Sequence, residues 1–155
     1  MQAALKNVMT TDLFVIPAGS PLRIARDLMD EKRIRHLPVV NASQEIVGIL
    51  SQNPLFYLES LEDLSVNDVM VKNVLSIDQH APLRYAIFKF LENKVSSLLV
   101  VDQNKAVIGI ITTDDLLWYL STLLEDAKQK RFSFSSLFDL QTVGEVARQV
   151  ASVGL

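Results

Sequence analysis

The sequence predicts a mixed α/β (α+β) fold in which two β-α-β-β-α repeats are related by pseudo-twofold symmetry and are followed by a short C-terminal helix. Three observations predict this fold. The two halves of the 155-residue chain align without a gap at one constant offset of 61 residues (70 minus 9). Each half places an amphipathic helical pattern before two β-rich segments. A repeat of about 55 residues would bury only about 60% of its chain surface, so two repeats are expected to pack together.

Short motifs recur at this offset. Val8-Met9 aligns with Val69-Met70, and Gly48-Ile49 aligns with Gly109-Ile110. The register continues without a gap through turns and helices, which indicates a duplication rather than a chance match.

The repeat divides the chain into three segments. We expect the first repeat at residues 7–61, the second at 66–126, and a linker with a C-terminal amphipathic helix at 127–155. The tail helix is predicted from a capping box at Thr142–Glu145 and the apolar stripe that follows it. At about three turns this helix is too short to be stable alone, so we expect it to dock on a partner subunit or a client protein.

Each repeat contains the same elements in the same order. In the first repeat the patterns predict an extended piece at 13–16, a helix at 21–32, strands at 36–40 and 45–50, and a closing helix at 55–61. In the second repeat they predict these elements at 74–77, 82–93, 97–102, 106–111 and 115–126. Each long helix opens with proline, whose missing N–H has no intrahelical partner there, and Ser20 is placed to cap the first of them. The strands are almost continuously apolar, which predicts sheets buried on both faces.

The composition argues against several functional classes. Lys and Arg total 15 against 18 Asp and Glu, so the net charge is −3 and no basic excess supports nucleic-acid binding. The chain has no cysteine and two histidines, so thiolate nucleophiles, structural zinc and His-rich metal sites are missing, and we expect no enzymatic activity. No apolar run approaches the roughly 20 residues that cross a bilayer, and the N-terminus lacks a signal-peptide pattern. We therefore expect a cytoplasmic protein without membrane insertion.

Three motifs, in this order and partly repeated, resemble the CBS domain family over residues 7–121. They are Val-Met-Thr at 8–10, Arg-His-Leu-Pro-Val-Val at 35–40 and Gly-Ile-Ile-Thr-Thr-Asp-Asp-Leu at 109–116. The resemblance implies a tandem CBS pair, or Bateman module, which is non-catalytic and often dimerised. Its clefts bind AMP, ADP, ATP or a related adenosyl ligand, and it regulates an attached or partner protein. We therefore expect a homodimer, an adenine nucleotide as regulatory ligand with no required cofactor, and an unidentified client protein.

The resemblance also implies ligand-binding residues in the second repeat. In the family pattern Gly-x-x-Ser/Thr-x-x-Asp, the ribose-binding hydroxyl and carboxylate correspond to Thr112 and Asp115. A carboxylate can accept hydrogen bonds from both ribose hydroxyls, and such bonds contribute roughly 1.5–3 kcal/mol each. The same residues also fit a capping box at the start of a helix, which needs no ligand.

The first repeat departs from this pattern. Ser51 is retained, but Pro54 stands where the ribose-binding acid belongs, so we expect a degenerate second site that is weakened roughly tenfold to a hundredfold. Arg35 and His36 match positions that contact phosphate in nucleotide-binding relatives. A basic run at the end of a helix is also favoured by the helix dipole alone, so a phosphate role is one of two interpretations.

Two functions remain open on the sequence. The first is a nucleotide-sensing regulatory module that acts in trans, and the second is a ligand-free dimerisation or protein-interaction module. The closing helix contains Leu116–Leu124, which is apolar nearly all the way round, so we expect part of it to pack against a second chain.

Overall fold

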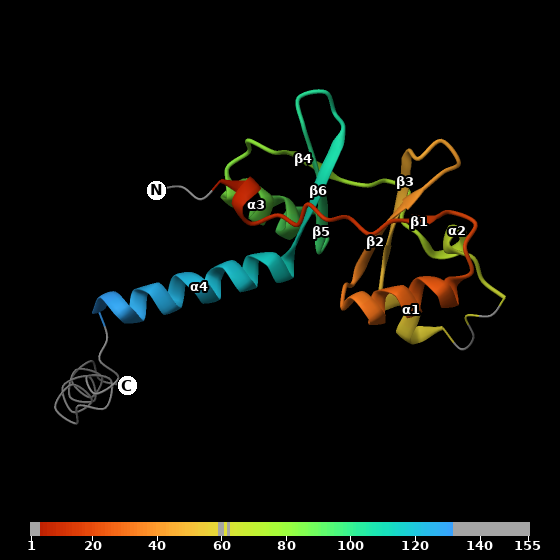
Figure 1. Ribbon diagram of the computed structural model, residues 1–155, viewed down its shortest axis with the longest axis horizontal. Helices are drawn as coiled ribbons and strands as arrows, with labels where there is room; N and C mark the ends of the chain where they lie inside the picture. The colour runs from red at the N-terminus through yellow and green to blue at the C-terminus, as the bar shows by residue number, and fades with distance from the viewer. Residues whose placement is uncertain (1–3, 59–60, 62, 132–155) are drawn as a thin grey trace, which may run out of the picture. The chain divides into compact units, whose positions relative to one another are not determined.

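The computed structural model of the chain describes residues 4–58, 61 and 63–131, with side chains described up to residue 125 (Figure 1). Residues up to Asp115 form one compact unit, and Leu116 begins a second. The linker expected beyond residue 131 and the helix expected after Thr142 lie outside the described residues.

Each repeat in the first unit builds its own three-stranded sheet. The first sheet contains, in order, β1 (Ile16–Pro17), β2 (His36–Val40) and β3 (Ile46–Ser51). The second contains β4 (Ser76–Asp78), β5 (Ser97–Val101) and β6 (Val107–Thr112). In both sheets the first pair of strands is parallel and the second is an antiparallel hairpin. The matching order and direction confirm the predicted fold class and repeat layout.

A long helix packs beside each hairpin, α1 (Leu22–Lys32) on the first and α3 (Leu83–Asn93) on the second (Figure 1). The inner faces carry the buried residues Leu22, Ala25 and Met29 in α1 and Leu83, Ala86 and Phe90 in α3. The predicted Ser20 cap is wrong, because Pro21 is the N-cap residue and no side chain caps the helix. The backbone N–H of Leu22 instead donates to the carbonyl of Leu64, 2.9 Å away.

The elements that close each repeat differ from the predictions. The closing helix expected at 55–61 is a 3-10 turn, η2 (Asn53–Tyr57), which has proline in its first turn and no capping side chain. Its counterpart α4 (Thr113–Arg131) begins two residues before the predicted start and continues into the segment expected to be linker. A one-turn helix, α2 (Val66–Val69), and a 3-10 turn, η1 (Leu5–Asn7), lie at the beginning of the second and first repeats.

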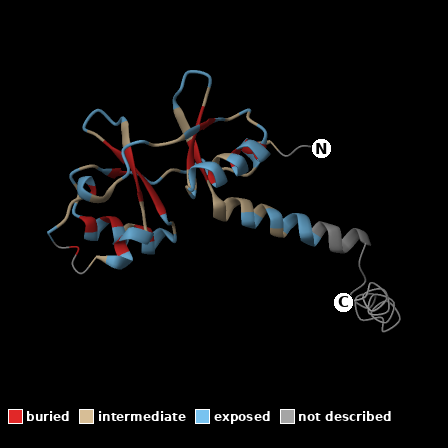
Figure 2. Cartoon of the chain, turned by 180° about the vertical axis from the view of Figure 1, so that it is seen from behind, coloured by how far each residue is buried: buried red, intermediate tan, exposed pale blue. Residues whose placement is uncertain are grey.

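Buried residues concentrate on the strands and on the helix faces turned toward them (Figure 2). Every residue of β2 is buried, as the continuous apolar pattern predicts. A smaller cluster joins Ile49 from the first repeat to Leu99 and Ile110 from the second. The two repeats therefore share hydrophobic packing, which supplies burial that neither repeat has alone.

Backbone hydrogen bonds also join the repeats. Thr10 and Ile110 exchange two N–H···O bonds of 2.9 Å, and Val71 and Ile49 do the same at the equivalent place. At this crossing a Cβ on Gly109 would lie 2.8 Å from the carbonyl oxygen of Thr10. The recurring glycine is thus explained by the close approach of the other repeat's N-terminal segment.

Candidate functional site

The two predicted ribose-binding residues lie where β6 leads into α4. The backbone N–H and the hydroxyl of Thr112 donate to Oδ2 of Asp115 at 2.7 and 2.8 Å. The backbone N–H of Asp115 in turn is 3.2 Å from the Thr112 hydroxyl oxygen. The capping box that the sequence left as an alternative is therefore present, and it fixes the carboxylate at the start of the helix.

The second carboxylate oxygen of Asp115 is much less engaged. Its Oδ1 atom receives only a long hydrogen bond, 3.4 Å, from the hydroxyl of Thr10 among the described side chains. Asp115 is half-buried, and Thr10 is exposed on the segment that crosses β6. One oxygen thus holds the helix start, while the other keeps acceptor capacity at the junction of the two repeats.

Arg35 lies just before β2 and forms an ion pair across the repeats. Its Nε donates to Oδ2 of Asp114 at 2.9 Å, and its Nη2 bonds the other carboxylate oxygen. The hydrogen bond and the charge of Asp114 raise the pKa of Arg35 above its ordinary value. Both side chains remain nearly half exposed, at 47% and 44%. Sequence analysis placed Arg35 near phosphate but missed Asp114 as its partner, because 79 residues separate the two.

His36 is the first residue of β2 and is 9% exposed. Its Nε2 lies 2.8 Å from the hydroxyl oxygen of Ser96, the residue equivalent to Arg35 in the second repeat. Burial, aided by the neighbouring positive charge of Arg35, lowers the pKa of His36 to about 4. At neutral pH the ring is therefore uncharged, so it can offer a hydrogen bond to a phosphate but no positive charge.

A small polar cavity lies between the repeats, with a volume of about 130 Å³. Its lining residues are Arg35, His36, Ser51, Gln52, Asn53, Ser96 and Thr113. The backbone around it is symmetric, because Gln52 N–H donates to Arg35 O and Thr113 N–H donates to Ser96 O. Ligand pockets for whole small molecules are typically about 300–1,000 Å³, so this cavity fits a phosphate-sized group rather than a nucleotide.

The first repeat lacks the carboxylate that organises the second. Ser51 lines the cavity, whereas Pro54 lies in η2 and provides no acceptor side chain. Gln52 is instead tied to α1 through a 3.0 Å hydrogen bond from its Nε2 to Asp30. The two junctions thus have the same backbone position and different polar chemistry.

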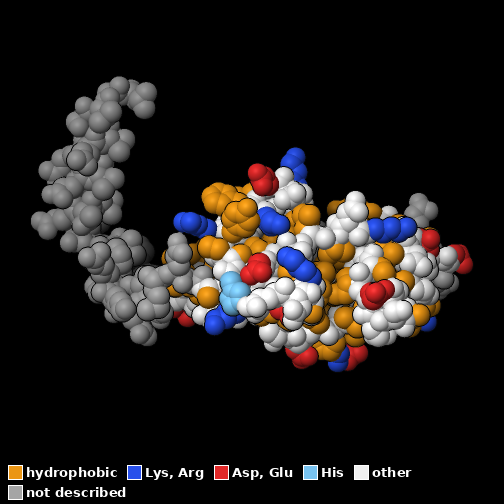
Figure 3. All heavy atoms as spheres, turned by 90° about the horizontal axis from the view of Figure 1, so that it is seen from above, with side chains coloured by type: hydrophobic (Ala, Val, Ile, Leu, Met, Phe, Trp, Pro, Cys, Tyr) orange, Lys and Arg blue, Asp and Glu red, His pale blue; other side chains and the backbone are white. Residues whose placement is uncertain are grey.

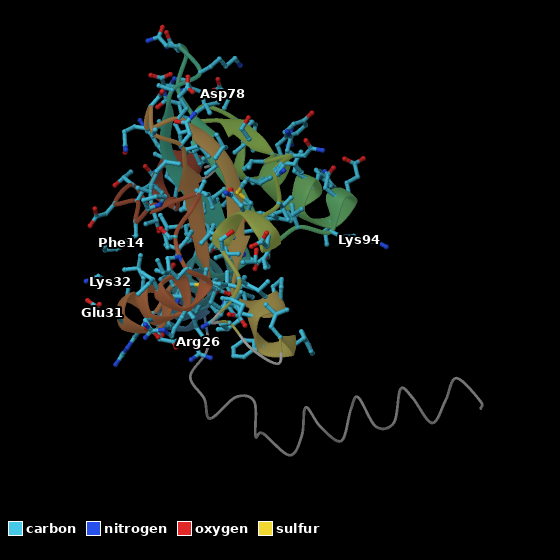
Figure 4. All side chains as sticks on the ribbon, turned by 90° about the vertical axis from the view of Figure 1, so that its right-hand side faces the viewer. Phe14, Arg26, Glu31, Lys32, Asp78 and Lys94 are labelled. Atoms are coloured by element: carbon cyan, nitrogen blue, oxygen red, sulfur yellow. The ribbon has the colours of Figure 1, made fainter. Side chains whose placement is uncertain are left out.

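The basic run at the end of α1, which consists of Lys32, Arg33, Arg35 and His36, also contains a residue with partners of its own. The Lys32 ammonium lies 5.4 Å from the centre of the Phe14 ring and 2.7 Å from a carboxylate oxygen of Glu31. Figure 4 shows these three labelled side chains close together. Of this run, Arg35 and His36 line the cavity, whereas Lys32 does not.

Other classes of site find little support in the described part of the chain. Charged side chains of both signs are scattered over the face seen in Figure 3, without a broad basic patch. No group of three or more His, Asp or Glu residues suited to a metal ion occurs among the described residues. Within the same residues, no helix is both long enough and apolar enough to span a bilayer.

Comparison with known proteins places this geometry in a family. The model of the CBS domain matches residues 5–53 and 66–122, which correspond to the two repeats. Homoserine O-acetyltransferase of Methanosphaera stadtmanae is 34% identical over 112 residues, which are 72% of this chain and 23% of that protein. The chain thus spans about a quarter of the length of this relative.

Solved structures show the same fold. The CBS domain pair of protein MJ0100, in complex with 5′-methylthioadenosine and S-adenosyl-L-methionine, superimposes with a TM-score of 0.69 and 20% identity, covering 76% of this chain and 99% of that one. CBSX2 in complex with AMP gives a TM-score of 0.66 and 25% identity, covering 77% and 97%.

Proposed function

Because the chain belongs to the CBS domain family, we propose that it is a non-catalytic regulatory module that binds an adenine nucleotide or related adenosyl ligand between its repeats. In this proposal it acts in trans, in the cytoplasm and as a homodimer, on a client protein. The absence of cysteine is compatible with a reducing compartment. Thr112 and Asp115 would hold the ribose, and Arg35 and His36 would meet the phosphate.

The divided role of the Asp115 carboxylate carries this proposal. Oδ2 is held by two short hydrogen bonds from Thr112, so the side chain is already oriented before any ligand arrives. Oδ1 faces the crossing segment and, among the described side chains, has only the 3.4 Å contact with Thr10. A ribose hydroxyl would replace a weak contact with a charge-assisted hydrogen bond, worth roughly 1.5–3 kcal/mol.

The Arg35–Asp114 pair supports a phosphate position beside the ribose position. Asp114 and Asp115 are adjacent in the first turn of α4, so the guanidinium is held close to the proposed ribose-binding acid. A half-exposed ion pair is worth about 0–1 kcal/mol, so a phosphate can compete for the guanidinium at small cost. The neutral His36 and the serines of the cavity add hydrogen-bonding groups but no further positive charge. The AMP complex of CBSX2 is consistent with an adenine nucleotide as ligand.

The alternative function is a ligand-free dimerisation or protein-interaction module. One observation favours it: among the described residues, no buried side-chain nitrogen or oxygen lacks a hydrogen-bond partner. No buried polar group of the described residues therefore requires a ligand as its hydrogen-bond partner, as would also hold in a purely structural pair.

Asp115→Asn distinguishes the two functions. The full chain is titrated with AMP, ADP, ATP and S-adenosylmethionine by calorimetry, and its thermal unfolding is followed with each. The substitution keeps the size of the side chain but removes its charge, so we expect the affinity of the best ligand to fall roughly tenfold to a hundredfold. Loss of the charged cap is expected to lower the free energy of unfolding by about 1 kcal/mol or less.

Asp68→Asn is the matched control. Asp68 makes the same kind of capping box, because its Oδ2 accepts from the N–H and hydroxyl of Ser65 at 2.8 and 2.7 Å, but it lies at the start of α2. We expect Asp68→Asn to leave ligand affinity unchanged. Equal affinities in both variants, or a chain whose unfolding temperature none of the four ligands raises, would favour the ligand-free module.

A further inference from the structure

The ion pair between Arg35 and Asp114 has no charged counterpart in the other repeat. At the offset of 61 residues, Arg35 corresponds to Ser96 and Asp114 corresponds to Asn53, so the equivalent pair is neutral. Ser96 and Asn53 both line the cavity, and the backbone hydrogen bonds on the two sides are equivalent. The fold of this junction therefore does not require an acid at position 114, and the presence of Asp114 needs its own explanation.

The cavity offers little positive charge to a ligand. Among its described lining residues, Arg35 alone carries a permanent positive charge. His36 also lines the cavity, but burial lowers its pKa to about 4, so the ring is neutral at pH 7. Asp114 bonds the guanidinium through both carboxylate oxygens, and Asp115 follows it in the first turn of α4. Two carboxylates thus lie close to the only permanent cation of the lining.

The size and the charge of the cavity restrict the same property of a ligand. A volume of about 130 Å³ fits one phosphate-sized group. A nucleoside monophosphate carries about two negative charges near pH 7.5, and each further phosphate adds about one more. One phosphate can compete with Asp114 for the guanidinium. A second or third phosphate would meet no further permanent cation in the described lining and would be repelled by the two carboxylates.

We propose that Asp114 is a specificity-determining residue, which neutralises Arg35 and so makes the cavity selective for an adenine nucleoside monophosphate over the triphosphate. This inference rests on the proposed nucleotide function and deepens it by naming the charge class of the ligand. Asp114 does not hold the ligand. It acts through the guanidinium that it pairs with, and it limits the number of phosphates that the site accepts.

Asp114→Asn tests this role in the full chain. The substitution keeps the size of the side chain but removes the negative charge beside Arg35. AMP, ATP and adenosine are titrated by calorimetry without divalent cations, so that each nucleotide keeps its full charge. We expect the wild type to bind AMP at least about tenfold more tightly than ATP, and the variant to lower this ratio at least about tenfold by gaining affinity for ATP. Adenosine has no phosphate, so its affinity should be the same in both proteins.

Two further variants control for the general effect of changing an acid. Asp27→Asn alters the net charge of the chain equally, because Asp27 is an exposed acid that lies 3.7 Å from Arg23 in α1, outside the cavity lining. Asp114→Glu keeps the negative charge at the site. We expect both variants to keep the wild-type ratio of AMP affinity to ATP affinity. Circular dichroism and thermal unfolding should show that all three variants are folded.

The possible results separate this inference from the proposed function. A wild-type chain that binds ATP as tightly as AMP would overturn the selectivity, and this test needs no variant. An Asp114→Asn variant whose affinity ratio changes no more than that of Asp27→Asn would overturn the role of Asp114. Either result would leave nucleotide binding itself standing. A chain that binds none of the three compounds would overturn both the inference and the proposed function.

Discussion

The two repeats of this chain share the backbone of their sheets but differ in their side-chain chemistry. Their hairpins share the same register, with His36 opposite Ser51 and Ser97 opposite Thr112, and each has an irregularity at the equivalent place. Yet the residues just before these strands differ, because Arg35 is charged whereas its equivalent Ser96 is neutral, and both line the cavity. The polar residues at this end of the two hairpins can therefore differ while the strand register stays the same.

The difference is largest where each hairpin leads into its closing helix. Thr112 and Asp115 cap α4, which runs for 19 residues, whereas Ser51 precedes a 3-10 turn of five residues that contains Pro54. In the second repeat the same carboxylate starts a helix and is the proposed ligand acceptor. A structural cap and a candidate site thus share one residue.

The largest effect is expected at the backbone crossings of the two repeats. Gly109→Ala would place a Cβ 2.8 Å from the backbone oxygen of Thr10, whereas the nearest atom for Gly48→Ala is the flexible Met70 sulfur, 2.6 Å away. A side chain can move more readily than a hydrogen-bonded backbone. We expect Gly109→Ala to lower the free energy of unfolding by about 3 kcal/mol and Gly48→Ala by about 1 kcal/mol, measured by urea denaturation. Equal losses would show that the crossings are equivalent despite their different neighbours.

An intermediate effect is expected from a change of pH, because the first repeat has His36 where the second repeat has Ser97. The native pKa of His36 is about 4 and its ordinary value is 6.5. Between these values the unfolded chain binds the proton more strongly, so stability falls as the pH falls through this window. We expect a loss of about 2 kcal/mol between pH 7.5 and 5, measured by urea denaturation.

His36→Gln is the control for this pH dependence. Glutamine retains a hydrogen-bonding group for the Ser96 hydroxyl but does not titrate. The variant should therefore lose much less stability than the wild type between pH 7.5 and 5. A variant with the same pH dependence as the wild type would assign the effect to other groups.

The smallest effect is expected from restoring an acid in the first repeat. Pro54→Asp would place a carboxylate three residues after Ser51, the spacing that joins Thr112 to Asp115. If the proposed nucleotide function is correct, calorimetry should show ligand affinity at this second cleft rising roughly tenfold, with a second binding event per chain. Pro54→Ala removes the proline without adding an acceptor and should bind as the wild type does. Identical titrations of the two variants would contradict the assignment of the degenerate site to the missing acid.

Much of the fold and part of the site are readable from the sequence because they depend on local or repeated patterns. The 61-residue offset predicts two equivalent sheets, and continuous apolar strands predict their burial. The Thr112–Asp115 contact spans three residues, so its motif is visible without a fold. Ser20 shows the limit of local rules, because the carbonyl of Leu64 satisfies the helix N–H that a cap would have served.

Sequence alone thus determined the duplication, the order of elements and the capping motif beside the proposed ribose position. Only the tertiary structure decided that Arg35 pairs with Asp114, 79 residues away, and that His36 is buried against Ser96, 60 residues away. Such contacts depend on how two separately formed sheets pack, and no local propensity specifies which polar side chains then meet. The charge at the proposed phosphate position is therefore set by packing rather than by the motif.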